Sequence, residues 1–195
     1  MQGRTPRGLE CRMGRVRDVL DDQLARWVES QPVFFVATAP TSVDGHVNCS
    51  PKGNRGELAV VDGSTVAYLD QTGSGTETIA HLGDNGRIVL MFCAFDGPPR
   101  IVRVHGRGRA LLARSAAAAA MSGHFAGSGG VGVRSVIVVD VERVSDSCGY
   151  GVPLMRFAGH RPTMDEWVAR KGRDGIEQYW KEKNASSIDG LPGIP

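Results

Sequence analysis

The chain has 195 residues, of which 41% are hydrophobic and 23% are charged, values that suit one globular domain with a buried core. The formal net charge of +2 is too small to indicate a nucleic-acid-binding protein by itself. The sequence contains no run of 18 apolar residues, and its basic N-terminus lacks the apolar stretch of a secretory signal, so we expect neither a transmembrane helix nor an exported protein.

The four cysteines are spread along the chain and form no CxxC pair. This usage predicts free thiols in a cytoplasmic protein. The cysteines are Cys11, Cys49, Cys93 and Cys148.

Residues 1–17 carry five arginines and a single acid, Glu10. They show no periodic apolar pattern, which predicts a flexible basic tail. The alternative is an arm that binds nucleic acid or a membrane. Ordered-looking sequence begins just after Met13, so Met13 is a hypothetical natural start, which the mass of the native protein would test.

Residues 18–30 have apolar residues at helical spacing and predict an amphipathic helix that ends before Pro32. Four strands are expected next, with turn signals at Asp44-Gly45 and at Asp62-Gly63-Ser64. They lie in VFFVATA (33–39), HVNCSPKG (46–53) and the two halves of LAVVDGSTVAYLD (58–70).

The rest of the chain alternates further strands with short helices. Helices are expected in ETIAHL and in ARSAAAAAMSGHF, and strands in RIVLMFCAF, RIVRVHGRGRALL and VRSVIVVDVERV. About six to seven antiparallel strands with short turns predict a mainly β fold, a small barrel with flanking helices. Residues 159–195 predict a helical C-terminal extension, with two short helices, that packs on the same domain.

The stretch YLDQTGSGTETIAHL, 68–82, turns from a strand into a helix through glycines and hydroxyls. A helix start offers unpaired N–H groups, and glycines let the backbone approach an anion, so this turn is a candidate phosphate site. It is not a P-loop, because no Gly-Lys-Ser/Thr follows. The alternative is a capping box with Ser74 or Thr76 as the N-cap and Glu77 as its partner; the two interpretations are compatible.

The strand HVNCSPKG offers a second candidate surface. Pro51 cannot donate to a β ladder, so the strand ends there or lies at a sheet edge. Lys52 then projects either into solvent or into a cavity that it shares with Ser74. The five histidines and four cysteines show no metal-ligand spacing, so we expect no metal. The sequence also lacks the G-x-S-x-G elbow that would indicate a serine nucleophile.

Together these stretches resemble the pyridoxamine 5′-phosphate oxidase-like family of FMN-binding split barrels, over about residues 18–150. The resemblance rests on VFFVATA-turn-HVNCSPKG, on VAYLDQTGSGTETIAHL followed by NGRIVLMF, and on PPRIVRVHGRGRAL. SPKG and CGYGVPLM look like a largely uncharacterised bacterial and fungal branch. The resemblance implies a split-barrel FMN-binding domain over 18–158 and a homodimer with FMN at two sites between the subunits.

The resemblance also implies which residues hold the cofactor. The SPKG strand would run along the flavin ring, and the strand-to-helix turn would hold the phosphate. The implied cofactor-binding residues are Asn48, Ser50, Pro51, Lys52, Asp70, Thr72, Gly73, Ser74, Thr76 and Arg103. Tyr150, in CGYGVP, is a candidate on the substrate side, with a packed turn as the alternative.

The turn departs from the family pattern in its charge. The well-known oxidases carry Ser-Arg-Lys where this chain has Ser74, Gly75 and Thr76. The positive charge must then come from Arg100, Arg103 or Lys52, and a missing charge-assisted hydrogen bond costs about 1.5–3 kcal/mol. We therefore expect weaker FMN binding, or the deazaflavin F420 in its place.

The resemblance implies an FMN-dependent oxidoreductase, oxidase or reductase, that passes electrons through the flavin to a small-molecule substrate. No acid–base residue stands out, so the catalytic residues are unknown. The C-terminal tryptophan and arginine of the vitamin B6 oxidases find no clear match, which argues against pyridoxine phosphate. The alternatives are an F420-dependent reductase, a flavin- or haem-binding protein without turnover, and a nucleic-acid-associated protein that uses the arginine-rich tail, although no nucleic acid or membrane partner is expected.

Overall fold

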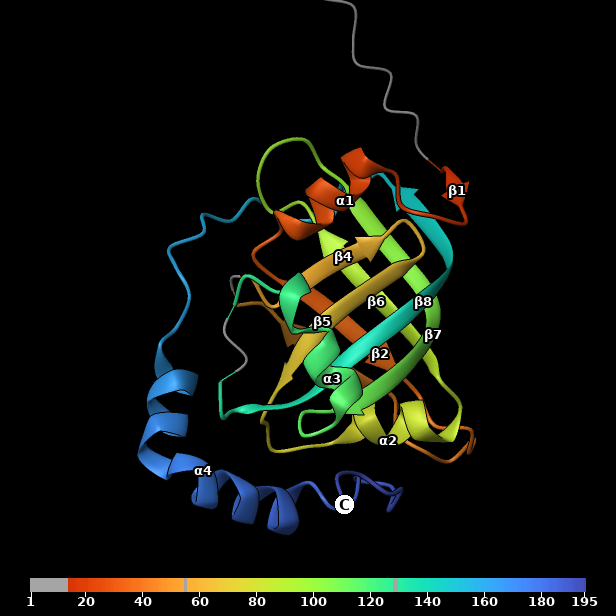
Figure 1. Cartoon of the computed structure of the whole chain (residues 1–195). Coiled ribbons are helices and arrows are strands. Elements are labelled where there is room, and N and C mark those ends of the chain that lie inside the picture. The colour runs from red at the N-terminus through yellow and green to blue at the C-terminus, as the bar shows by residue number, and fades with distance from the viewer. Residues whose placement is uncertain (1–13, 55, 128–129) are drawn as a thin grey trace, which may run out of the picture.

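The computed structural model describes residues 14–54, 56–127 and 130–195. In this part of the chain, eight antiparallel strands form one sheet (Figure 1). Their bounds are β1 Val16–Arg17, β2 Phe34–Thr38, β3 Asn48–Lys52, β4 Leu58–Asp62, β5 Thr65–Gln71, β6 Arg87–Cys93, β7 Ile101–Leu112 and β8 Val133–Ser147. The prediction of a mainly β split barrel is confirmed.

The sheet runs in the order β3-β2-β6-β7-β8-β5-β4, and β1 pairs with β8. The long strands β7 and β8 curve through a bulge between His105 and Gly106. A Cβ at Gly106 would collide with the carbonyl oxygen of Asp140, so only glycine allows the two strands to stay this close. The curvature brings the edge strand β3 to face β5, the neighbour of the other edge strand β4, across a gap that the Lys52–Asp70 ion pair spans.

The inside of the barrel is filled by side chains from one face of the sheet, which on β2 alternate with less buried ones. Phe34, Val36 and Thr38 of β2 are buried, whereas Phe35 and Ala37 between them are half-buried. Phe34 packs edge-on against Tyr68 and stacks on Phe92, with ring centroids 5.5 Å apart in both pairs. This alternation is the period of a sheet with one face on the core.

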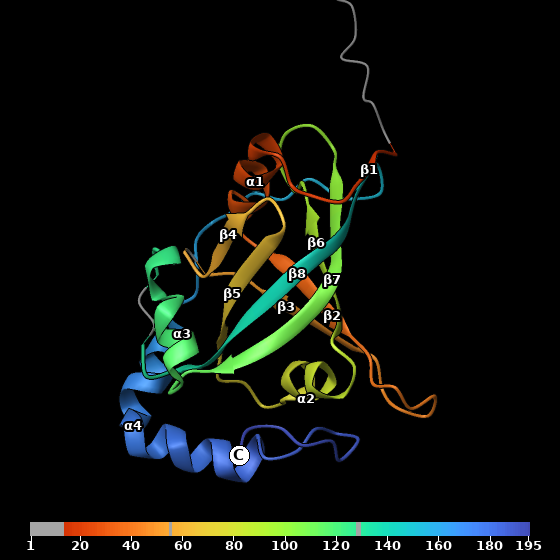
Figure 2. The same ribbon diagram turned by 45° about the vertical axis from the view of Figure 1, so that its right-hand side comes forward.

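Helices close the barrel and extend from it. They are α1 Asp22–Glu29, α2 Glu77–Asp84, α3 Ala116–Ala120, the 3-10 turn η1 Ser122–His124 and α4 Thr163–Lys183. The Asp21 carboxylate caps α1 by accepting from the Leu24 amide at 2.9 Å. Figure 2 shows α2 between the strands of the barrel and the C-terminal part of the chain, with α1 at the opposite end.

The C-terminal extension wraps around the barrel. Residues 148–162 run along its side without helix or strand and lead into α4 (Figure 1). Gly172 interrupts α4 with φ +64° and ψ 179°, a conformation that glycine adopts without strain. The two short helices expected from the sequence are therefore the two arms of α4.

Both edges of the sheet are shielded. The edge strand β3 contains Pro51, which has no N–H to offer. On the edge strand β4, the Val60 amide donates to the Glu29 carboxylate of α1 at 2.8 Å. Each edge thus has fewer free donors for a further strand.

The N-terminal stretch expected as a tail is partly structured. Val16 and Arg17 form β1, and Arg17 lies 3.8 Å from Asp146 on β8, so the sheet has one strand more than expected. Residues 1–13, including Met13, lie outside the described residues. Within the described ranges, no helix has the length and hydropathy to span a bilayer.

Candidate functional site

A cavity of about 350 Å³ opens in the gap between β3 and the turn that follows β5. We call it the strand cavity. One wall is the inward side of β3, and the opposite wall is the turn into α2 with the start of β8. Its lining includes Asn48, Ser50, Pro51, Lys52, Glu57, Thr72, Gly73, Ser74, Gly75, Glu77, Thr78 and Arg134.

One ion pair joins the two walls of the strand cavity, and a second lies within one wall. The fully buried Asp70 carboxylate accepts from Lys52 Nζ at 2.9 Å and from Arg134 Nε at 2.7 Å. Burial alone would raise the pKa of Asp70, but the charges of Lys52 and Arg134 outweigh it and hold the pKa below its ordinary value. Lys52 and Arg134 share one carboxylate, so this group keeps one net positive charge beside the cavity.

Asn48 ties β3 to the neighbouring strand and to α2. Its amide nitrogen donates to the hydroxyls of Thr38 and Thr78 at 3.1 and 3.0 Å. Thr38 in turn lies 2.9 Å from the Nδ1 atom of the buried His81. Burial lowers the pKa of His81, so this network is built around a neutral imidazole.

The turn into α2 has free backbone donors. Thr76 occupies the N-cap but makes no side-chain capping hydrogen bond, and Glu77 accepts instead from the Ile188 amide at 3.3 Å. The alternative of a capping box is therefore wrong. Within the described residues, the backbone amides of residues 73–79 donate no hydrogen bond, which leaves the turn suited to an anion.

The hydroxyl of Thr72 is committed to the protein itself. It donates to the Gly132 carbonyl at 2.7 Å and accepts from Trp180 Nε1 at 2.8 Å. Asn184 Nδ2 donates to the Gly73 carbonyl at 3.0 Å. The C-terminal extension thus holds the turn in place from outside the barrel.

Polar atoms of the strand cavity fit a phosphorylated, hydroxyl-bearing cofactor. Ser50 Oγ is buried and has no hydrogen-bond partner in the described residues, and such an atom is costly unless a ligand satisfies it. The unsatisfied amides of the turn and the Lys52 ammonium face the same space. Two carboxylates oppose a dianion there: Glu57, which accepts from Gln71 at 2.6 Å, and Glu77 at the turn.

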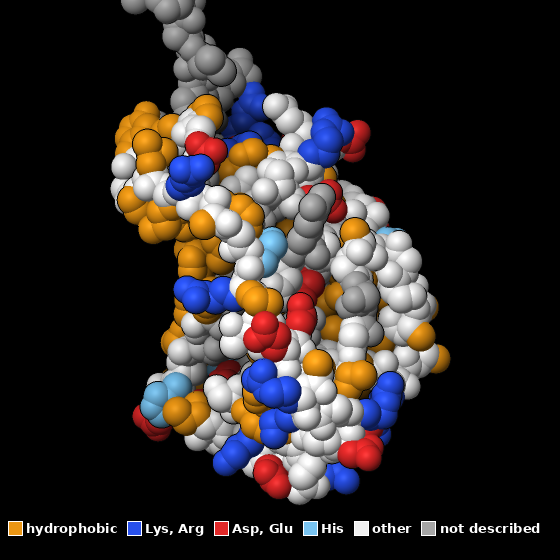
Figure 3. Space-filling model, turned by 90° about the vertical axis from the view of Figure 1, so that its left-hand side faces the viewer, with side chains coloured by type: hydrophobic (Ala, Val, Ile, Leu, Met, Phe, Trp, Pro, Cys, Tyr) orange, Lys and Arg blue, Asp and Glu red, His pale blue; other side chains and the backbone are white. Residues whose placement is uncertain are grey.

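A larger cavity of about 980 Å³ adjoins the first and is closed on one side by α4 and the segment before it. We call it the helix cavity. Figure 3 shows that this face of the molecule is indented between a largely hydrophobic lobe and a region where Lys and Arg side chains gather. The two cavities share Pro51, Gly53, Asn54, Thr72, Gly73, Ser74 and Met164.

Of the eleven predicted site residues, seven line the strand cavity and four do not. Asn48, Ser50, Pro51, Lys52, Thr72, Gly73 and Ser74 line the strand cavity. Asp70 lies beneath it as the partner of Lys52. Thr76 is buried and contacts the C-terminal loop, where a Cβ at Gly193 would collide with it.

Arg103 and Tyr150 line neither cavity. Arg103 alternates with the buried Val102 and Val104, so its side chain lies on the outer face of β7, where it donates to Ser147 Oγ at 3.1 Å. Tyr150 is 70% exposed. Arg100, the other cation expected to supply charge, pairs with Asp146 at 2.8 Å.

Sequence reasoning missed Arg134, which supplies the second cation. The available signal was an arginine within the apolar run VRSVIVV, because a charge on a buried strand requires a partner. Trp167, Arg170, Lys171 and Tyr179 were also missed, because nothing in a helical segment shows which side faces a cavity. Among the described residues, no group of three His, Cys, Asp or Glu side chains is placed to hold a metal ion.

Comparison with known proteins places this fold in a family. The family model described as pyridoxamine 5′-phosphate oxidase matches residues 20–148. The pyridoxamine 5′-phosphate oxidase family protein ustO of Aspergillus flavus is 38% identical over 189 residues, covering 90% of this chain and 76% of that protein.

Two solved structures show weaker similarity. A HupZ protein of Group A Streptococcus has a TM-score of 0.48 and 22% identity, covering 65% of this chain and 98% of the other. An FMN-binding protein of Syntrophomonas wolfei has a TM-score of 0.47 and 16% identity, covering 68% and 86%. The match to the family model and the identity to the Aspergillus protein show that this chain belongs to the pyridoxamine 5′-phosphate oxidase family.

Proposed function

We propose that this protein is an FMN-dependent oxidoreductase that binds the ribityl phosphate of FMN in the strand cavity. The carrying observation is the uncapped turn 73–79, whose free amides open onto a cavity lined by Lys52. An anion at this position receives backbone hydrogen bonds and the favourable end of the α2 dipole. The family to which the chain belongs supports a flavin as that anion.

Each wall of the cavity has a separate task in this proposal. Lys52, which reaches across the gap from β3, meets the phosphate charge, while Arg134 on β8 stays bound to Asp70 on the neighbouring strand β5 and keeps that carboxylate neutralised. Ser50 and Asn48, on the inward side of β3, face the ribityl hydroxyls. The bound flavin would supply the electron-transfer chemistry, and the protein binds it, orients it and limits the access of water.

Glu77 sets a limit on the affinity. Its carboxylate lies at the same turn, where a side chain at Gly75 would collide with it, and it repels a dianion. The turn therefore carries a negative charge and none of the cations of the Ser-Arg-Lys pattern, which agrees with the weaker FMN binding expected from Ser74-Gly75-Thr76. Removal of the Lys52 charge should therefore weaken FMN binding, and removal of the Glu77 charge should strengthen it.

The test is titration with FMN, with riboflavin in parallel, after an absorbance spectrum and mass spectrometry of any released chromophore. Lys52→Met should weaken FMN binding about tenfold to a hundredfold, the cost of one charge-assisted hydrogen bond, and Glu77→Gln should strengthen it. Arg109→Gln, an exposed cation paired with Asp140, serves as the control. The proposal would be refuted if the purified protein is colourless and does not bind added FMN, or if the Lys52 and Glu77 variants bind FMN as well as the unchanged protein. Tighter binding of F420 than of FMN would instead indicate F420 as the cofactor of this cavity.

We also propose a homodimer, with the outer face of β2, β3 and β6 as the contact. The register places Phe35 beside Pro51 and Met91, and Ala37 beside Cys49 and Val89, on the side opposite the core. These side chains form an apolar face on which the β3 residues are exposed and the β2 and β6 residues are half-buried in one chain. A monomeric mass in solution at micromolar concentration would refute this arrangement.

We place the protein in the cytoplasm. Cys49, Cys93 and Cys148 form no disulfide with one another in the described part of the chain, which fits a reducing compartment. Fractionation of the producing cells would test the assignment.

A further inference from the structure

The helix cavity has a charge pattern unlike that of the strand cavity. Three cations line it: Arg161, just before α4, and Arg170 and Lys171 on it. Neither Asp nor Glu is among its lining residues. Within the described residues, none of the three cations lies within 4.0 Å of a carboxylate, so their charge is available to a ligand.

Aromatic rings hold one of these cations in place. Lys171 Nζ lies 5.3 Å from the centre of the Trp167 ring and 5.5 Å from that of Tyr179. The two rings contact each other edge-to-face at 5.1 Å. Cation–π contacts fix the ammonium without neutralising it, unlike the carboxylate that holds Lys52.

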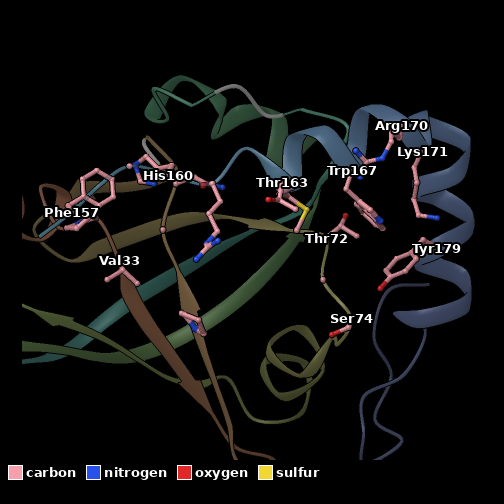
Figure 4. Close-up of a pocket in the computed structure, with 18 residues that line it drawn as sticks. Val33, Thr72, Ser74, Phe157, His160, Thr163, Trp167, Arg170, Lys171 and Tyr179 are labelled. Atoms are coloured by element: carbon pink, nitrogen blue, oxygen red, sulfur yellow. The ribbon is translucent and has the colours of Figure 1, made fainter. Parts of the chain in front are cut away.

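The opposite side of the cavity is also aromatic. Phe157 and His160 contact edge-to-face with centroids 4.9 Å apart. Figure 4 shows them across the cavity from Trp167 and Lys171, with Thr72 and Ser74 on the wall between. A ligand that fills this space meets flat rings on two sides and positive charge on one.

We infer that the helix cavity binds an aromatic organic anion, such as an aromatic carboxylate, and that this is the substrate site. Apolar walls with a few converging polar groups are the usual form of a small-molecule site. The assignment as substrate site rests on the proposed flavin function, because the two cavities also share Pro51 and Gly53, which belong to the stretch that would run along the flavin ring. The walls from α4 lie beyond the family model, which ends at residue 148, so the extension adds this specificity.

Three naphthalenes with the same ring system and a negative, neutral or positive substituent test the inference. The probes are 2-naphthoate, 2-naphthamide and 2-naphthylmethylammonium, titrated calorimetrically into the full chain with and without FMN. We expect 2-naphthoate to bind at least tenfold more tightly than the amide, the ammonium compound to bind weakest, and added salt to reduce the preference. Equal affinity for the three, or no binding of 2-naphthoate at millimolar concentration, would overturn it.

Matched variants locate the site. Lys171→Gln should weaken 2-naphthoate binding about threefold to tenfold, as for one partly exposed charged contact, and leave 2-naphthamide binding unchanged. Lys181→Gln, on the same helix but outside the cavity lining, should change neither. If the two variants behave alike, the anion binds elsewhere.

The two proposals fail in different measurements. Lys52→Met should lose FMN and keep 2-naphthoate binding, whereas Lys171→Gln should keep FMN and lose affinity for the anion. If the protein binds no flavin but still prefers 2-naphthoate, the cofactor proposal and the assignment of the helix cavity as a substrate site are refuted, whereas its assignment as an anion-binding site stands. A protein that binds FMN but does not discriminate them refutes only the inference drawn from the helix cavity.

Discussion

The two cavities share the wall at Thr72–Ser74, yet their charged groups are partnered in different ways. In the strand cavity, Lys52 and Arg134 are bound to Asp70, and Glu57 accepts hydrogen bonds from Asn54 and Gln71. In the helix cavity, the cations have no carboxylate partner among the described residues. The barrel thus uses most of its charge to hold its own strands together, whereas the extension keeps its charge for a ligand.

The largest effect should come from breaking the charge balance of the barrel. Asp70→Asn leaves the buried Arg134 with only the Gly75 carbonyl as a strong partner, and removal of one member of a buried ion pair costs about 3–5 kcal/mol. Urea denaturation would measure the free energy of unfolding. Asp140→Asn, which breaks an exposed pair with Arg109, should change the free energy of unfolding by about 0.5 kcal/mol or less. Similar losses of stability in both variants would show that the buried charges of the barrel matter no more than exposed ones.

A smaller effect should follow from loosening the wall that both cavities share. Trp180→Phe removes the hydrogen bond to Thr72 and should cost about 1 kcal/mol of stability, visible as a lower thermal midpoint. Trp167→Phe is the matched control, because the Trp167 indole N–H has no hydrogen-bond partner in the described part of the chain. If Trp167→Phe destabilises the fold as much as Trp180→Phe, the hydrogen bond to Thr72 is not what holds α4.

The smallest effect should be a pH dependence that arises from the barrel and not from the extension. Burial lowers the pKa of His81 below its ordinary value of 6.5, so the unfolded chain binds this proton more readily than the folded one. Stability should therefore fall as the pH decreases through about 6.5. The stabilisation from Asp70, whose pKa is also lowered, is lost only below about pH 4, which separates the two groups.

Thermal unfolding at a series of pH values between about 8 and 5 would measure this dependence. His81→Asn should flatten it, and His124→Asn, in an exposed turn, should not. His105 contributes in the same direction, because burial and then the charges of Arg143 and Arg103 lower its pKa. A slope that is unchanged in His81→Asn would show that the neutral imidazole does not set it.

Local sequence was enough to predict much of the barrel. The turn Asp62-Gly63-Ser64 lies where it was expected, with the Asp62 carboxylate accepting from the Ser64 amide at 2.8 Å. The strands on either side of it, β4 and β5, end within one residue of the stretch 58–70 in which they were predicted. Such features depend on neighbours in the chain, which a sequence displays directly.

The charges of the site were harder to predict, because they depend on distant partners. Lys52 and Asp70 are 18 residues apart, and Asp70 and Arg134 are 64 apart. The pairing of β5 with β8 brings Asp70 and Arg134 together, and only the closure of the barrel brings Lys52 to Asp70. Arg103 was predicted to bind the cofactor because of its charge, but the alternation along β7 places its side chain on the outer face of the sheet. The residues that line the helix cavity could not be predicted, because they depend on the bend of α4 at Gly172.

The shielded sheet edges have a consequence for how this chain behaves when it is concentrated. An exposed strand edge is a template for pairing with other chains and for fibril growth. Here Pro51 interrupts one edge and the Glu29 carboxylate occupies the Val60 amide on the other, so neither edge offers a continuous row of donors. The same proline that lines the strand cavity therefore also interrupts the sheet edge through which chains could pair, so a replacement of Pro51 should alter both the cavity and the tendency to aggregate.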